Sequence, residues 1–593
     1  MTTEPTSLYN TRALTDPLAY PSSADLAKTC DLVMKGGISS GVIYPLAICE
    51  LGRTHRISAV GGSSAGAIAA AAAAAAEAGR DSGGFARLAT IPQQLGETAF
   101  DGNTRLFHLF QPAPQTRRLW RLAIAALDKP KGLTATVGAF LPPMLALITA
   151  RPALFGVVGP ATIVVWAAAT TNWLAIALAL LLLAVSTIIA ALASLVQRLK
   201  TDLDATDFGL CTGMDGYNPK GSPSLTRWLT DTYNNLAGHK DPAAPVTFGN
   251  LSDAGVQLAM FTTNLTLGTQ TALPFNTRIW AFKKQEMAAL FPEEVVTWMC
   301  DNPPEDISTE TIDTFAQHGL HPLPNERDLP VVFGVRLSLS FPLLLSAVPL
   351  WAFDYTTDGA PPERHLFSDG GMTSNFPMHF FDTPLPSHPT FGINLKTVDS
   401  VDSEPQNNID MPDHNGASIL AQPKPITNIF GFLGSIKGTM QAWADNMQTH
   451  LPGYRDRIVA VKHTKTEGGL NLNMDEETIT DLANRGQAAG KRAAKFDLVN
   501  HQWIRYRTFI DLLEPFVTDA AAHLDRSTLS PAPTYRDMID GPPPTSYRQN
   551  WNNDQGHQIA DAIARLAELY NQNPNLNNDA PKPTGILQIR PTP

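Results

Sequence analysis

Charged residues are scarce in this chain of 593 residues, at 17% of the sequence, against about a quarter in average soluble domains. The formal net charge is -11, which leaves no broad basic field, so we expect no nucleic-acid partner. Cysteine is rare too. The four copies, Cys30, Cys49, Cys211 and Cys300, are widely separated, which argues against a metal site or a disulfide framework and favours a reducing compartment. We expect no metal and no other cofactor.

The first 27 residues lack an apolar run, so we expect no cleavable secretory signal, and residues 1–27 are predicted to form a flexible leader. Residues 134–196 lack charge instead, with Arg151 as the one exception. Residues 173–196 exceed the roughly 20 apolar residues that cross a bilayer, and residues 153–170 are near the lower limit. The insertion is therefore predicted to associate with a membrane. The alternative is a buried helical pair in a soluble domain, or a hydrophobic lid.

Basic residues flank this insertion at both ends. Because basic flanks favour the cytoplasmic side, we expect both ends there and an even number of crossings. Residues 153–170 are predicted to cross outward, Thr171-Asn172 to turn, and residues 173–196 to return, with residues 134–150 at the interface or re-entering. The predicted location is the inner (cytoplasmic) membrane, with the folded domain in the cytoplasm. The basic residues are Arg117, Arg118, Arg121, Lys129 and Lys131 before the insertion and Arg198 and Lys200 after it.

A strand candidate at residues 57–60 leads into a glycine-serine turn and then an alanine-rich helix. Residues 62–66 fit the pattern G-x-S-x-G, with Ser64 at the centre. In such a turn the central residue is strained, its hydroxyl is pushed clear of the sheet, and small neighbours such as Gly62 and Gly66 avoid collisions. The helix start, at Ala65, offers N–H groups and a positive dipole end to an oxyanion. The plain alternative is a Gly/Ser turn that caps a helix.

Two more stretches also follow strand candidates. In KGGISSG, the adjacent Gly36 and Gly37 let successive N–H groups form an anion-binding nest. Without that role it is an ordinary glycine turn, and it lacks the spacing of a phosphate-binding loop. In HLFSDGGMTSNFP, a strand ends at Asp369, where a carboxylate can accept a proton from a serine hydroxyl. The alternative there is a common Asp-Gly turn between strands.

Strand, turn and helix follow one another twice near the N-terminus, which indicates an α/β fold with a parallel sheet. A helix is expected over residues 42–51, and helical, polar stretches dominate residues 476–569. Residues after 571 are rich in Asn and Pro and are expected to be poorly ordered. The expected strands are residues 31–34, 57–60, 257–262, 331–333, 365–367, 390–395 and 458–462.

The glycine-rich loop after the first strand, then G-x-S-x-G, then the distant D-G-G resemble the patatin-like phospholipases in type and order. Residues 338–348 and 374–377 also resemble the family's segments around the aspartate. The resemblance implies a mostly parallel sheet flanked by helices and a carboxylic ester hydrolase with a Ser-Asp dyad and no catalytic histidine. Ser64 would be the nucleophile and Asp369 the general base. The other implied residues are Gly36, Gly37, Ile38 and Ala65 as oxyanion donors, and Gly62, Gly66, Gly370 and Gly371 as shaping glycines.

The implied activity is a phospholipase A-type or lysophospholipase reaction on a phospholipid or other acyl lipid, through an acyl-enzyme. Since Ser64 precedes the insertion and Asp369 follows it, the dyad itself requires an even number of membrane crossings. The oligomeric state cannot be predicted. The expected segments are 1–27 (leader), 28–133 (first part of the patatin-like domain), 134–200 (apolar insertion), 201–470 (second part), 471–570 (helical region) and 571–593 (tail).

Three other interpretations remain open. A Ser-His-Asp triad could draw on His379 or His388, which follow the serine and the aspartate in the chain. A catalytically weak or inactive patatin-like membrane protein with a binding or regulatory role is favoured by the altered loop: Lys35 replaces the family's first glycine and Ser39-Ser40 its basic residue. A transporter subunit is a third reading, although two crossings without charge make a poor pathway.

Overall fold

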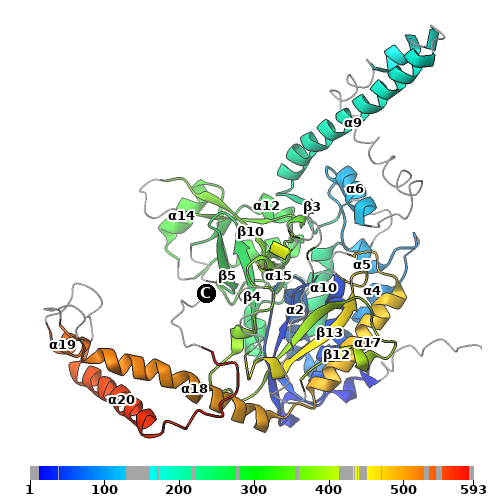
Figure 1. The fold of residues 1–593 in the computed structure, drawn as a ribbon. Coiled ribbons are helices and arrows are strands. Elements are labelled where there is room, and N and C mark those ends of the chain that lie inside the picture. The colour runs from blue at the N-terminus through cyan, green and yellow to red at the C-terminus, as the bar shows by residue number, and fades with distance from the viewer. Residues whose placement is uncertain are drawn as a thin grey trace, which may run out of the picture.

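The computed structural model describes residues 13–127 except 38 and 100, 160–216 except 167 and 170–172, 222–412 except 242, 276–278, 306 and 354–359, 451–526 except 469–470, 533–541 and 551–585, with residues 426, 432, 435, 436 and 439. An α/β body carries two helical projections (Figure 1). One is α9 (Trp173–Asp204), and the other is formed by α18 (Leu498–Leu524) and α20 (Asn553–Gln572).

The body is built on a mixed sheet with the strand order β12-β13-β11-β1-β2-β4-β10-β9-β6-β7, in which β5 also pairs with β4. Strands β13, β11, β1, β2 and β4 run parallel, whereas β10 pairs antiparallel with both β4 and β9. The α/β class is confirmed, but the sheet is mixed and not mostly parallel as the resemblance implied, because the strands from β10 to β7 and the edge strands β5 and β12 pair antiparallel. The strands are β1 (Thr29–Met34), β2 (Arg56–Gly62), β4 (Gln257–Asn264), β5 (Thr269–Leu273), β6 (Ala281–Phe282), β7 (His321–Pro322), β9 (Val348–Ala352), β10 (Glu363–Asp369), β11 (Thr390–Val398), β12 (Ile409–Asp410) and β13 (Ile458–Thr464).

Most of the predicted strands coincide with strands of this sheet. The prediction for residues 331–333 is wrong, because these residues begin α15 (Val331–Leu339), a helix whose nine residues are all buried. Two valines and a phenylalanine suggest a strand by composition, and a short apolar run cannot be assigned by periodicity alone. A second, two-stranded parallel sheet joins β3 (Gly209–Cys211) to β8 (Leu343–Leu345).

Helices surround the sheet, and α2 (Ala65–Ala78) is the one that matters for the site. Twelve of its fourteen residues are buried, which its alanines permit because they allow close approach to neighbouring elements. The other helices are α1 (Tyr44–Gly52), α3 (Gly84–Leu88), α4 (Ile91–Gly96), α5 (Arg105–His108), α6 (Arg117–Leu127), α10 (Leu225–Ala237), α11 (Phe248–Asp253), α12 (Lys284–Ala288), α13 (Glu293–Asp301), α14 (Thr309–Gln317), α17 (Glu476–Ala493) and α19 (Tyr535–Asp540).

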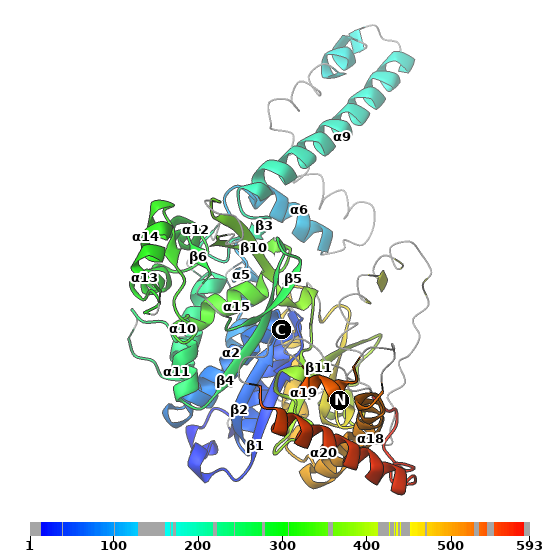
Figure 2. The ribbon, with the colours of Figure 1, turned by 90° about the vertical axis from the view of Figure 1, so that its left-hand side faces the viewer.

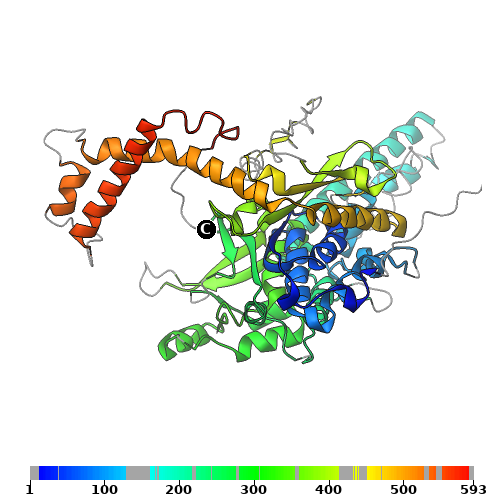
Figure 3. The same cartoon turned by 90° about the horizontal axis from the view of Figure 1, so that it is seen from below.

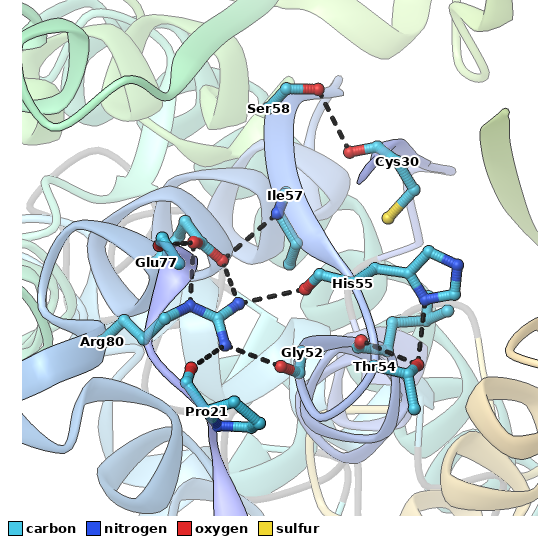
Figure 4. Close-up of polar contacts among 11 residues, drawn as sticks. Pro21, Cys30, Gly52, Thr54, His55, Ile57, Ser58, Glu77 and Arg80 are labelled. Carbon is cyan, nitrogen blue, oxygen red and sulfur yellow. Dashed lines mark hydrogen bonds and ion pairs between the residues drawn. The ribbon is translucent and has the colours of Figure 1, made fainter. Parts of the chain in front are cut away.

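A buried ion pair ties the C-terminal end of α2 to its neighbours (Figure 4). Arg80 pairs with Glu77 at 2.5 Å, both side chains are 2% exposed, and the guanidinium also donates to the carbonyls of Pro21, Gly52 and His55. The early chain is thus held against the core. Leu14 and Tyr20 are buried there, so residues 13–27 differ from the expected loose leader, while residues 1–12 lie outside the described part.

Two segments that flank the apolar insertion in the sequence meet in the body. Pro112 forms a bridge with Cys211, and the N–H of Ala113 donates to the carbonyl of Leu210 at 3.0 Å. From there α9 extends away from the body (Figure 2). Only 17% of its most apolar stretch is buried, so this helix is not the buried core helix of the alternative interpretation.

The remainder of the predicted hairpin is only partly described. Residues 160–166 are helical, whereas residues 134–150, Arg151 and Thr171-Asn172 lie outside the described residues. The outward crossing and the turn therefore stay predictions. The C-terminal part of the chain carries α17, α18, α19 and α20. Seen from below, α18 and α20 lie side by side away from the sheet (Figure 3), and the hydroxyl of Tyr570 donates to the carbonyl of Ile510 at 2.9 Å.

Candidate active site

Ser64 occupies a sharp turn between β2 and α2. Its backbone has φ 57° and ψ -131°, a conformation that is costly for a residue with a side chain. Such strain is typical of a nucleophile elbow, which aims a serine hydroxyl away from the sheet. The side chain is 5% exposed.

The two glycines that flank Ser64 are required by close packing. A Cβ atom at Gly62 would lie 2.4 Å from the carbonyl carbon of Gly66. A Cβ atom at Gly66 would lie 2.2 Å from the carbonyl oxygen of Met34, the last residue of β1. The turn at Ser64 therefore packs directly against the end of β1, where the glycine-rich stretch KGGISSG begins.

The hydroxyl of Ser64 donates to Asp369 Oδ2 at 2.7 Å, across 305 residues of sequence. The sheet register explains this approach. Gly62 pairs with Met260 in β4, and Thr262 in the same strand pairs with Asp369. Ser64, two residues past Gly62, therefore reaches the level of Asp369 from the other side of β4.

The carboxylate of Asp369 is itself held in place. It is 2% exposed, and its Oδ1 atom accepts the N–H of Gly371 at 2.6 Å, so the turn after β10 fixes the orientation of the side chain. At Gly370 a Cβ atom would lie 1.9 Å from the carbonyl oxygen of Phe261, so this position also needs glycine. The hydroxyl of Thr263 donates to the carbonyl of Asp369 at 2.9 Å.

Two buried serines at the end of α15 support the pair, and the sequence analysis did not single them out. The N–H of Ser64 donates to Ser338 Oγ at 3.2 Å. The carbonyl of Ser340 accepts both the N–H of Asp369, at 3.1 Å, and the hydroxyl of Ser368, at 2.7 Å. Both serines belong to the segment 338–348 that carries part of the family resemblance, which was the available signal.

Arg336 is a fully buried cation that contacts one of these serines, Ser340. Its guanidinium donates to Ser340 Oγ at 2.7 Å and to the carbonyls of Thr212 and Ser346 at 2.8 and 3.2 Å. Burial lowers the pKa of Arg336 to about 10. The side chain thus joins the segment after β3, where the chain returns from α9, to the segment that supports the dyad residues.

The expected oxyanion donors differ in the hydrogen bonds that their N–H groups make. The N–H of Gly36 donates to the carbonyl of Asn375 at 2.9 Å, so in this structure it is not available to bind an oxyanion. No acceptor for the N–H of Gly37 or Ala65 lies among the described residues. Ile38 lies outside the described part of the chain. The loop is nevertheless next to the nucleophile, since a Cβ at Gly36 would lie 2.9 Å from that of Ser64.

The two histidines of the triad interpretation, His379 and His388, make contacts with other residues. His388 Nε2 is 3.1 Å from Asp31 Oδ1 and 3.3 Å from the hydroxyl of Ser58, near the start of β1 and β2, and the hydrogen bond to Asp31 raises its pKa. The ring of His379 packs against Phe261. Among the described residues Asp369 is the one side-chain partner of the Ser64 hydroxyl, which favours the dyad over a triad.

An apolar cavity begins beside the nucleophile. Its free volume is about 80 Å³. Ala65, the residue after Ser64, and Leu339, the residue after Ser338, both line it. No group of three metal-ligating side chains occurs in the described part of the chain. The arrangement suits acyl transfer to a serine, with space for an apolar acyl group.

Comparison with known proteins identifies the family. The chain is 33% identical to the RpoH suppressor of Rhizobium meliloti (strain 1021) in an alignment of 651 positions that covers 95% of this chain and 99% of that protein. The chain belongs to the RpoH suppressor family. No family model matches it.

Two solved structures resemble this RpoH suppressor relative only weakly. The crystal structure of VipD from Legionella pneumophila has a TM-score of 0.27 and 11% identity, and covers 94% of this chain and 89% of that one. The crystal structure of the type III effector protein ExoU has a TM-score of 0.23 and 11% identity, with 92% and 79% covered. Both TM-scores are too low for a common fold to be inferred.

Proposed function

We propose that the chain is a membrane-attached, patatin-like lipid acyl hydrolase, of the phospholipase A or lysophospholipase type, with Ser64 as nucleophile and Asp369 as general base. The observation that carries the proposal is the 2.7 Å hydrogen bond from Ser64 Oγ to Asp369 Oδ2, made by a serine with a strained backbone at the start of a helix. A buried carboxylate that accepts a serine hydroxyl directly needs no histidine to take the proton.

The proposed reaction uses these groups in turn. Asp369 accepts the proton of Ser64 as the serine oxygen attacks the ester carbonyl, and the protonated acid then gives that proton to the leaving alcohol. The N–H groups of Ala65 and Gly37 are the donors proposed for the oxyanion, and one such donor contributes about 3–4 kcal/mol to transition-state stabilisation. Asp369 next deprotonates a water that hydrolyses the acyl-enzyme, which restores the free serine.

Attachment to a membrane is supported by α9, whose apolar side chains are exposed. The bridge between Pro112, before the insertion, and Cys211, after it, holds the two flanking segments side by side, and this supports the even number of crossings that we propose. Arg121 and Lys200 flank the insertion, so we place the body on the cytoplasmic side of the inner membrane. An enzyme held there meets acyl lipids, and we propose a membrane phospholipid or a related acyl lipid as substrate.

Hydrolysis of short-chain esters by the full chain in detergent tests this proposal. Ser64→Ala is expected to reduce hydrolysis to background, and Asp369→Asn to lower kcat about 100- to 10,000-fold, the usual contribution of a general base. Ser63→Ala is the matched control, because Ser63 is fully buried and its hydroxyl has no partner among the described residues. Wild-type activity in either dyad variant would refute the assignment.

A second function is favoured by one observation. Since the N–H of Gly36 is engaged by Asn375, the oxyanion site lacks one expected donor, which suits a non-hydrolytic lipid-binding protein with a regulatory role. The relative's name, RpoH suppressor, states an effect and no chemistry, and so is compatible with either function. Binding of phospholipid vesicles by the wild type, with no ester hydrolysis and no reaction of Ser64 with a fluorophosphonate, would support this second function.

A further inference from the structure

The cavity beside Ser64 has one apolar wall formed by α2. Ala65, Ile68, Ala69 and Ala72 line it, at the spacing that places residues on a single helix face. Ala65 directly follows Ser64 in the chain, and Ala72 lies two helical turns further along. Because three of these four side chains are methyl groups, the wall leaves empty space that larger residues would fill.

Other helices complete the lining of the cavity. Leu88 and Ile91 line it together with α10 residues, and the hydroxyl of Tyr233 is turned to the carbonyl of Ile68 at 3.4 Å, so the phenol adds little polarity. Trp228 also lines a neighbouring, more polar pocket that contains Glu97 and Arg105.

We propose that this cavity holds the acyl chain of the substrate and that the alanine face of α2 sets the chain length that fits. The proposal rests on the proposed hydrolase function and specifies its substrate. In this proposal an acyl group bound to Ser64 Oγ enters the cavity past Ala65, the lining residue next to Ser64 in the chain. A cavity lined almost wholly by hydrocarbon offers a free alkyl chain the same transfer from water that burial in a core provides.

The rise of the helix relates each alanine position on α2 to a number of acyl-chain carbons. A helix rises about 1.5 Å per residue, so Ala69 lies about 6 Å and Ala72 about 10 Å beyond Ala65. An extended alkyl chain advances roughly 1.3 Å per carbon, given C–C bonds of about 1.5 Å. The acyl chain therefore reaches Ala69 at about its fifth carbon and Ala72 at about its eighth.

Leucine substitutions at Ala69 and Ala72 test whether these positions limit the length of the acyl chain. The probes are p-nitrophenyl esters from acetyl to palmitoyl, with kcat/KM measured for each on full-length protein. In the wild type kcat/KM is expected to rise about fourfold per methylene until the cavity is full, the factor that corresponds to the burial of one methylene group. Ala72→Leu should stop this rise at about eight carbons and Ala69→Leu at about five.

Ala78→Leu is the matched control, with the same change on the same helix at a half-buried position that does not line the cavity. It should keep the wild-type chain-length profile. Since leucine enters empty space at Ala69 and Ala72, these variants should also unfold at or above the wild-type temperature, which separates blocked binding from misfolding. Identical profiles for all three variants, or cut-offs in the reverse order, would overturn the proposal.

A binding measurement separates failure of this inference from failure of the proposed function. Displacement of a fluorescent fatty acid from Ser64→Ala protein by fatty acids of increasing length needs no catalysis. Chain-length-dependent displacement that Ala69→Leu and Ala72→Leu shorten in order supports the cavity even if no ester is hydrolysed. Ester hydrolysis together with displacement that is independent of length would leave the hydrolase standing and exclude the cavity as its acyl site.

Discussion

Replacing Gly66 by alanine tests the packing that positions the nucleophile. A Cβ atom there would lie 2.2 Å from the carbonyl oxygen of Met34 and 2.9 Å from its carbonyl carbon. Both are backbone atoms, so no change of rotamer can relieve the overlap. Either the start of α2 or the end of β1 must move by about 1 Å to restore an ordinary contact of 3.4 Å.

The expected magnitude follows from this displacement. Overpacking in a dense interior costs about 1–3 kcal/mol, and the upper end applies because both contacting groups belong to backbone. The better helix propensity of alanine offsets about 1 kcal/mol. Gly66→Ala should therefore lower the free energy of unfolding by about 2 kcal/mol. Because the same shift displaces Ser64 by a comparable distance, kcat/KM should fall about 100-fold.

Urea unfolding and ester hydrolysis measure the two effects. Gly41→Ala is the stability control, because a Cβ at Gly41 has its nearest neighbour, the Cβ of Ala65, at an ordinary 3.8 Å. That variant should unfold within about 0.5 kcal/mol of the wild type, as is usual away from tight contacts. If Gly66→Ala proves as stable and as active as the wild type, the close packing of the elbow on β1 is not what positions Ser64.

Three further predictions concern the supports of the site and the body. Ser338→Ala leaves the buried N–H of Ser64 without its acceptor, and we expect a loss of about 1–3 kcal/mol in urea unfolding together with reduced kcat. Arg80→Ala should cost about 3–5 kcal/mol because it strands the buried Glu77 carboxylate, and restored stability in the double variant with Glu77→Leu would show that the stranded charge is the cause. Although burial opposes ionisation of Glu467, hydrogen bonds lower its pKa from 4.5 to about 2. A lowered folded-state pKa stabilises above the unfolded value, so the stability lost in Glu467→Gln should be full above pH 4.5 and shrink as the pH falls towards 2.

Ser64 and Asp369 could be singled out from the sequence because each follows a strand and lies in a glycine pattern that fixes its local geometry. Ser64 needs small neighbours and Asp369 needs a tight turn, and glycines close to each residue in the sequence meet these requirements. Their approach across β4 depends on strand register, which the order of the three stretches implied only through the family resemblance. The parallel strands were predictable for the same local reasons.

The supporting residues could not be found in this way. Ser338 and Arg336 act through contacts with segments far away in the sequence, and their own neighbourhood is an apolar run that also misled the prediction of a strand at residues 331–333. The acceptor of the Gly36 N–H is a backbone carbonyl, at Asn375, and no side-chain pattern records it. The apolar cavity arises from the packing of several helices, which no local pattern in the sequence records.

Reaction of the intact protein with a fluorophosphonate, followed by mass spectrometry of its peptides, tests the dyad most directly. The Ser64–Asp369 hydrogen bond predicts one adduct, on Ser64 in the wild type, and a large loss of its rate of formation in Asp369→Asn. An unmodified Ser64 in a folded wild-type protein, or equal labelling rates with and without the carboxylate, would contradict the account.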